Sequence, residues 1–76
     1  MSQIIASHLQ AGYIFGDHTT GEYIYMPAGE IGTDYPVCVL ETAEGRQDIA
    51  LNEAASLVQR LSLKRVKHPR LGNKSC

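Results

Sequence analysis

The segment YPVCVLETAEGRQDIAL, residues 35–51, carries the clearest secondary-structure signal in the sequence. Its apolar, β-branched run VCVL stops at TAEG, and hydrophobic residues resume at Ile49. Gly45 can supply the positive φ that a three- to five-residue hairpin loop needs after a type I turn, and Pro36 suits the first residue of a strand, where a missing N–H matters least. The segment therefore predicts a β-hairpin.

A second hairpin is predicted in GYIFGDHTTGEYIYMP, residues 12–27, with strands at Tyr13–Phe15 and Tyr23–Met26. Aromatic and β-branched residues, which favour strands, flank a polar loop bounded by Gly16 and Gly21. The connection between the two hairpins, MPAGEIGTDYP, follows neither the strand period nor the helix period. It is long for a compact domain, and long connections often carry function.

The hydrophobic period changes from strand to helix after Leu51. Asn52 is a good helix N-cap, and Glu53 suits the positive end of a helix dipole. One helical stripe contains four apolar residues: Ala54, Leu57, Val58 and Leu61. The pattern decays where the basic residues begin, so we predict an amphipathic helix over Asn52–Leu63 that frays before Pro69.

The N-terminal segment SQIIASHLQAG fits two structures. Ile5 and Leu9 lie one helical turn apart, but Ile5, Ser7, Leu9 and Ala11 also alternate as in a strand. We favour a short helix closed by Gly12, because glycine readily ends a helix, and we keep an edge strand as the alternative.

Together these elements predict a small α+β fold in a single domain. A chain of 76 residues is too short to be divided into two cores. We expect an antiparallel sheet of about four strands, made of the two hairpins, with the helix Asn52–Leu63 packed on one face. The domain is predicted to span residues 1–66, and residues 67–76 are predicted to form a basic, flexible tail.

Charge is divided unevenly along the chain. Residues 1–59 contain eight carboxylates and a single cation, Arg46. This segment, which we call the acidic body, therefore has a net charge of −7. From Arg60 onward there are six cations and no Asp or Glu, which gives +6. A dense basic run binds nucleic acid through phosphates, but it also serves as a solubilising end. The candidate nucleic-acid contacts are Lys64, Arg65, Lys67 and Arg70.

The two cysteines, Cys38 within an apolar run and Cys76 at the last position, are too few for the disulfide framework of a small secreted domain. The sequence shows no signal-peptide pattern and no apolar run of the roughly eighteen residues that a membrane span needs. We therefore expect free thiols in a reducing compartment, a cytoplasmic location and no contact with membranes.

No sequence motif indicates a particular enzymatic reaction. His8, His18 and His68 occur singly, without the paired spacing of a zinc site. The loop GDHTTGE could hold a cation through its oxygens, but polar residues are usual in exposed turns. Cys38 lies between apolar neighbours and is expected in the core rather than as a thiolate nucleophile. We expect no enzyme activity, no metal and no cofactor.

The four tyrosines and Phe15 could form a stacking surface for nucleic-acid bases. A chain without tryptophan, however, needs its large side chains for its own core. Most of these rings are therefore expected inside the domain, with at least one tyrosine hydroxyl at the surface.

The sequence favours a small protein-binding module, regulatory or inhibitory, whose acidic body docks on a basic partner. Glu41, Glu44 and Asp48, around the predicted TAEG turn, are the expected contacts, and their charge would steer association. Such a surface could also occupy the groove of a nucleic-acid-binding protein by mimicking phosphates. The alternative is a nucleic-acid-binding protein that uses the basic segment, with the acidic body turned away or engaged in a homo-oligomer contact.

Overall fold

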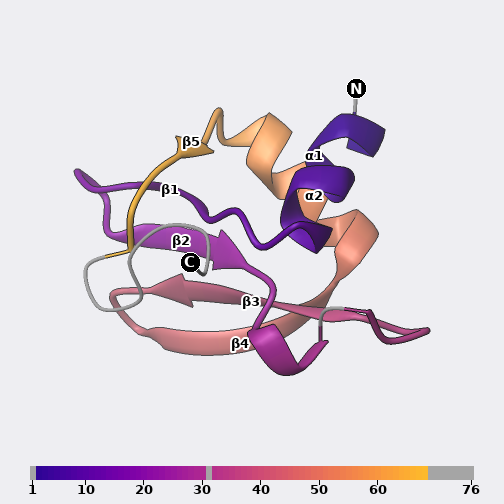
Figure 1. The fold of residues 1–76 in the computed structure, drawn as a ribbon. Coiled ribbons are helices and arrows are strands. Elements are labelled where there is room, and N and C mark those ends of the chain that lie inside the picture. The colour runs from indigo at the N-terminus through magenta and orange to yellow at the C-terminus, as the bar shows by residue number, and fades with distance from the viewer. Residues whose placement is uncertain (1, 31, 69–76) are drawn as a thin grey trace.

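Residues 2–30 and 32–68 are described by the computed structural model (Figure 1). This part of the chain contains both helices and strands, as predicted for an α+β fold. In chain order the elements are α1 (Ser2–Gln10), β1 (Phe15–Asp17), β2 (Glu22–Tyr25), the 3₁₀ turn η1 (Ala28–Glu30), β3 (Val37–Thr42), β4 (Gly45–Ala50), α2 (Leu51–Arg60) and β5 (Lys64–Arg65). The predicted fold class is confirmed.

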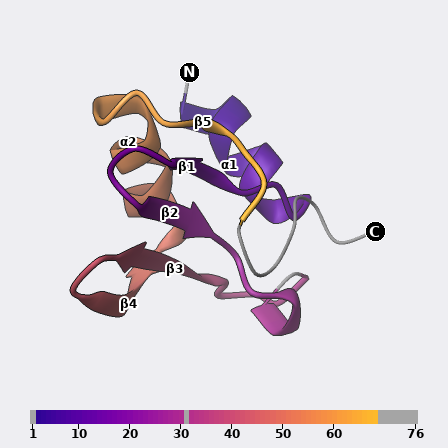
Figure 2. The same cartoon turned by 90° about the vertical axis from the view of Figure 1, so that its left-hand side faces the viewer.

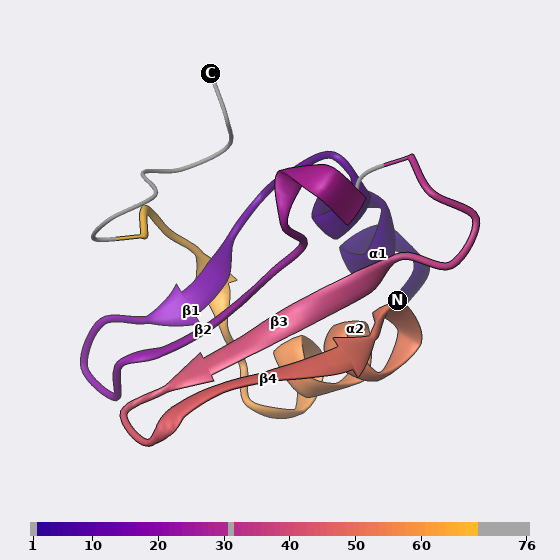
Figure 3. The ribbon, with the colours of Figure 1, turned by 90° about the horizontal axis from the view of Figure 1, so that it is seen from below.

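All described strands join one antiparallel sheet in the order β4-β3-β2-β1-β5. Both predicted hairpins are present, β1 with β2 and β3 with β4, and the pairing of β2 with β3 joins them into a four-strand meander (Figure 3). β5 adds a fifth strand beside β1, at the edge opposite β4. Within the described chain, β4 is the long edge strand and β5 the short one.

Both helices pack against each other and cover the same face of the sheet, as Figures 1 and 2 show. Alternate strand residues point to opposite faces, so each strand contributes to this helix face and to the face behind it. The core of the helix face is formed by Leu9, Phe15, Ile24, Met26, Cys38, Ile49, Ala54, Val58 and Leu63. We call the opposite face the tyrosine face, because Tyr23 and Tyr25 lie there beside Ile14 and Val39.

The end of α2 differs from the prediction. The helix stops at Arg60 rather than Leu63, and Ser62 takes a positive φ of 56°, which turns the chain back toward the sheet. As a result Leu61, predicted on the buried stripe, is 43% exposed, whereas Leu63 is buried. The helical wheel was wrong beyond Arg60 because the residues after it are not helical.

The start of α2 also lies one residue earlier than predicted. Ala50 occupies the N-cap position and offers no side-chain hydrogen bond. Asn52 is inside the first turn instead, where its Oδ1 accepts a hydrogen bond from the N–H of Glu53 at 2.9 Å. The helix is held by the apolar residues it buries, Ala54, Ala55 and Val58, and it forms without a side-chain cap.

The first strand lies two residues later than predicted, because Gly16 belongs to the strand rather than to the loop. Gly16 pairs with Tyr23 across the hairpin, and a Cβ at Gly16 would come within 2.5 Å of both the Glu22 carbonyl oxygen and Tyr23 Cδ1. Glycine therefore lets the Tyr23 ring lie over the strand. The loop between β1 and β2 then contains His18–Gly21.

The segment after Leu63 is a strand, not the fraying helix that was predicted. Lys64 pairs with Gly16 and Arg65 with Phe15, and the N–H of Val66 donates to the Ile14 carbonyl at 2.9 Å. His68, two residues further on, is only 2% exposed. The predicted tail thus begins with residues that lie against the sheet, while residues 69–76, with Arg70, fall outside the described part.

The N-terminal segment forms the short helix α1, and the edge-strand alternative is wrong. Gly12 follows it with a φ of 98°, as expected of a glycine that ends a helix. The N–H of Gly12 donates to the Leu9 carbonyl and that of Tyr13 to the His8 carbonyl, which leads the chain into the sheet.

Replacing Gly45 with valine is expected to destabilise the protein by about 1–2 kcal/mol, because β-branched residues resist positive φ. The turn between β3 and β4 is a tight one, with Thr42 paired to Gly45, and Gly45 has a φ of 142°. A Cβ there would meet no atom within 4 Å, so the cost comes from the backbone alone. Chemical denaturation measures it. Gly29→Val, at an equally open site without positive φ, is the control, and equal stability of the two variants would contradict the turn geometry.

Candidate functional site

A buried polar cluster occupies the tyrosine face. His68 lies against this face with its ring centre 4.8 Å from that of Tyr23 and 5.6 Å from that of Tyr25. Its Nε2 is 3.1 Å and 3.2 Å from the two carboxylate oxygens of Glu41 on β3. The hydroxyl of Tyr25 donates to the same carboxylate at 3.2 Å. The basic segment is therefore joined to the acidic body by a hydrogen bond between His68 and the Glu41 carboxylate.

This cluster has the features of a structural contact. Both partners are shielded from solvent, the His68 side chain almost completely and the Glu41 side chain to 15% exposure. A second histidine, His18, contacts Tyr23 through a 2.8 Å hydrogen bond between its Nδ1 and the tyrosine hydroxyl. No buried side-chain nitrogen or oxygen in the described chain lacks a hydrogen-bond partner, so no polar group there points into an empty space.

The placement of Glu41 differs from the expectation of an exposed turn carboxylate. Its cross-strand partners are Tyr23 and Arg46, which puts it in the interior of the sheet rather than at the turn. Glu44 and Asp48, the other two predicted contacts, are exposed. Of the predicted docking residues, Glu41 is hydrogen-bonded to His68, and the Glu44 carboxylate accepts a hydrogen bond from the Thr42 hydroxyl at 3.4 Å.

Cys38 lies in the helix-face core, as predicted, and is fully buried. Burial raises the pKa of its thiol from 9.0 to about 11, because the charged thiolate is poorly solvated there. The side chain acts as a small apolar residue rather than as a nucleophile.

Iodoacetamide is accordingly expected to alkylate Cys38 at least about a hundredfold more slowly in the folded protein than in urea, because two units of pKa remove most of the thiolate. The measurement uses a Cys76→Ser background at pH 8, so that only one thiol reports. Equal rates in the two states would show that Cys38 is accessible.

The loop GDHTTGE uses its polar groups to build the β1–β2 turn. Asp17 Oδ1 accepts a hydrogen bond from the N–H of Thr19 at 2.8 Å, and Glu22 accepts one from the Thr20 hydroxyl at 3.1 Å. Among residues 2–30 and 32–68, no three His, Cys, Asp or Glu side chains gather closely enough to hold a metal ion.

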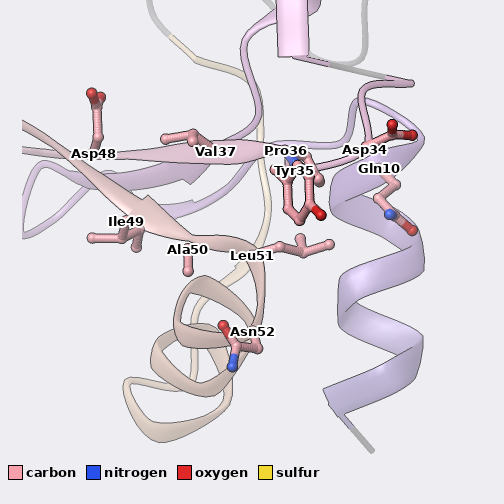
Figure 4. Close-up of a pocket in the computed structure, with 10 residues that line it drawn as sticks. All are labelled: Gln10, Asp34, Tyr35, Pro36, Val37, Asp48, Ile49, Ala50, Leu51 and Asn52. Carbon is pink, nitrogen blue, oxygen red and sulfur yellow. The ribbon is translucent and has the colours of Figure 1, made fainter.

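A hollow of about 680 Å³ lies at the end of the β3–β4 hairpin (Figure 4). We call it the acidic hollow. Figure 4 shows the ring of Tyr35 between the end of β4 and α1, with Leu51 pointing toward the same space. Its lining residues are Gln10, Asp34, Tyr35, Pro36, Val37, Asp48, Ile49, Ala50, Leu51 and Asn52.

Tyr35 is the unusual residue of the acidic hollow, because it is 89% exposed. Tyr23 and Tyr25 are buried, as predicted for most of the rings, so Tyr35 is the exception. Sequence reasoning noted its long, aperiodic connection but did not single out Tyr35 or Asp34. The only signal was an aromatic residue between Asp34 and Pro36, just before the first strand of its predicted hairpin.

The basic residues of β5 lie at the opposite edge of the sheet. Lys64, Arg65 and Lys67 are all exposed, and the Arg65 guanidinium carbon sits 4.7 Å from the ring centre of Tyr13. Together with Ile14 and Val66, the residues Tyr13, Arg65 and Lys67 line a hollow of about 350 Å³. The sheet thus separates a basic edge at β5 from the acidic hollow beside β4.

Compared with protein-family models, with curated proteins and with solved structures, the chain gives no significant match. No described helix combines the length and the apolar character needed to cross a membrane. The cytoplasmic location remains a prediction from the sequence.

Proposed function

We propose that this protein is a non-enzymatic binding module, regulatory or inhibitory, that holds a basic segment of a partner protein in the acidic hollow. One observation carries the proposal: the exposed ring of Tyr35 stands in the acidic hollow, and Asp34 and Asp48 lie at opposite ends of its lining (Figure 4). The site offers an apolar wall and negative charge together.

Each part of the acidic hollow suits a protein partner. Tyrosine is enriched among the residues that dominate binding energy, because it offers a rigid aromatic surface and a hydroxyl at low entropic cost. Val37 and Leu51, both half-buried, extend the apolar wall beside Tyr35. Asp34 and Asp48 complement a lysine or arginine. The ligand favoured by this chemistry is a chain segment with an apolar side chain next to a cation.

The titratable groups in the interior also favour binding over catalysis. Cys38 has a raised pKa and lies under the helices, and His68 is closed in by Glu41 and Tyr23. A catalytic nucleophile or base needs access to a substrate. In the described chain, the side chains that a partner can reach are those at the surface. Among them, Glu44 remains a predicted contact near the β3–β4 turn.

The experiment is a comparative affinity purification from nuclease-treated lysate. The hollow variant combines Asp34→Lys with Tyr35→Ala, both at exposed positions, and the control combines Lys64→Glu with Lys67→Glu at the basic edge. We expect a protein to be retained by the wild-type chain and by the control, and lost by the hollow variant. Loss with the control but not with the hollow variant would contradict the proposal.

A second candidate, nucleic-acid binding at the basic edge, is favoured by the neighbours of β5. In the sheet Lys64 and Arg65 pair with Gly16 and Phe15, which are neutral. Phosphate contacts by Lys64, Arg65 and Lys67 would make affinity fall steeply with salt. Titration of duplex and single-stranded nucleic acid at two salt concentrations tests this candidate, because the Lys64→Glu and Lys67→Glu changes should abolish any such slope.

A further inference from the structure

We infer that the outer edge of β4 pairs with the β4 strand of a second copy of this chain, to form a symmetric dimer with one continuous sheet. β4 is six residues long and ends the sheet, and the described chain places no strand on its outer side (Figure 3). Gly45, Arg46, Gln47 and Asp48 are all exposed. An edge of this length is a template for a further strand.

The charge pattern of β4 is complementary to itself. Arg46 and Asp48 lie on either side of Gln47, and both point to the tyrosine face, since they pair with Glu41 and Val39 of β3. Two antiparallel β4 strands related by a two-fold axis at Gln47 would put Arg46 of each copy opposite Asp48 of the other. Opposite charges at such cross-strand positions stabilise pairing, and like charges oppose it.

The same charges distinguish this pairing register from registers shifted by one or two residues. A shift by two residues in one direction brings Arg46 opposite Arg46 of the second copy. A shift in the other direction brings Asp48 opposite Asp48. Shifts by one residue would place the side chains of the two copies on opposite faces. The register centred on Gln47 is therefore the one that pairs unlike charges and keeps the faces aligned.

The surroundings of β4 leave room for a second copy. A two-fold axis perpendicular to the sheet puts the helices of both copies on one side of the joined sheet and both tyrosine faces on the other. The turn residues Ala43 and Glu44 of one copy would come opposite Leu51 and Ala50 of the other, where the acidic hollow opens. Asp34 lies outside the paired strands.

Among residues 2–30 and 32–68, neither Arg46 nor Asp48 forms an ion pair within its own chain. The paired edge is small, so we expect reversible dimerisation with a dissociation constant of roughly 1–100 μM. The inference shares Asp48 with the acidic hollow, but Arg46 does not line the hollow, so R46D tests the dimer without changing the proposed binding site.

Sedimentation equilibrium on the intact chain tests the dimer by charge exchange. R46D alone places Asp opposite Asp, D48R alone places Arg opposite Arg, and each should weaken dimerisation at least about tenfold. An equimolar mixture of the two variants, and the double variant R46D/D48R, restore unlike pairs and should dimerise like the wild type. The inference would be overturned if the wild-type chain stays monomeric at about 1 mM, a concentration above the dissociation constant expected for this interface. It would also be overturned if the mixture of the two variants remains monomeric.

Disulfide trapping gives a second readout that tolerates weak binding. Gln47 meets itself at the two-fold axis, at a cross-strand separation of about 4.5–5.5 Å between Cα atoms, which a disulfide can bridge. In a Cys76→Ser background, Gln47→Cys should form a covalent dimer with oxidised glutathione. Gln59→Cys, exposed on α2, is the matched control. Equal cross-linking at the two positions would contradict pairing at β4.

Discussion

Replacing Val58 with aspartate is expected to cost about 4–5 kcal/mol, a large part of the stability of so small a domain. Val58 is 2% exposed and packs in the helix-face core between α2 and the sheet. An aspartate there would be charged without a partner, or protonated at a pKa far from its usual range. Either state opposes folding, so we expect a largely unfolded chain at 25 °C.

Leu61→Asp is the matched control, because it makes the same kind of change on the same predicted stripe. The helical wheel alone predicts that Leu57 and Leu61 are equally intolerant of a charge, and that Ser56→Asp is nearly silent. In the structure Leu61 is exposed, so Leu61→Asp should resemble Ser56→Asp. Urea denaturation separates the outcomes: a cost for Leu61→Asp close to that for Val58→Asp would mean that α2 continues past Arg60.

Removing the carboxylate of Glu41 is expected to destabilise the protein by about 2–4 kcal/mol, because it takes away the shared acceptor of two hydrogen bonds from buried side chains. Glu41→Leu deprives both His68 Nε2 and the Tyr25 hydroxyl of an acceptor. The exposed Glu44 offers the control: Glu44→Leu should change stability by no more than about 0.5 kcal/mol.

A double-mutant cycle with His68→Leu tests whether the two residues act together. Because the pair is lost as a unit, the double variant should be more stable than the sum of the single losses implies, by on the order of 1 kcal/mol or more. Additive losses would show that Glu41 and His68 contribute separately. The charge pattern alone predicts that a chain cut after Val66 keeps its fold. Because the cut removes His68, we expect it to destabilise the protein.

Local patterns predicted much of this fold correctly. The β3–β4 hairpin followed from an apolar run and a glycine turn, and α2 from the spacing of Ala54 and Val58, because these signals arise within a few neighbouring residues. Cys38 was placed in the core from its flanking apolar residues alone. The fold class needed only the sum of such segments.

The errors came from contacts between distant residues. Lys64 and Arg65 have no strand signal of their own, and they become β5 only because β1 presents an unpaired edge. His68 is buried through Glu41, which is 27 residues away in the sequence. From the sequence, Glu41 was expected as an exposed turn carboxylate, and His68 was considered only as an isolated candidate metal ligand. The exposure of the Tyr35 ring was not predicted, because it depends on the path that the connection before β3 takes in the folded protein.

Photo-crosslinking from the acidic hollow tests the proposed function most directly. Tyr35, exposed and aromatic, is replaced by p-benzoylphenylalanine, which keeps the ring, and Lys64 is replaced in the same way at the basic edge. The proposal predicts that irradiation in lysate yields a protein adduct at position 35 that resists nuclease and is lost with Asp34→Lys. An adduct formed only at position 64, or one removed by nuclease, would contradict it.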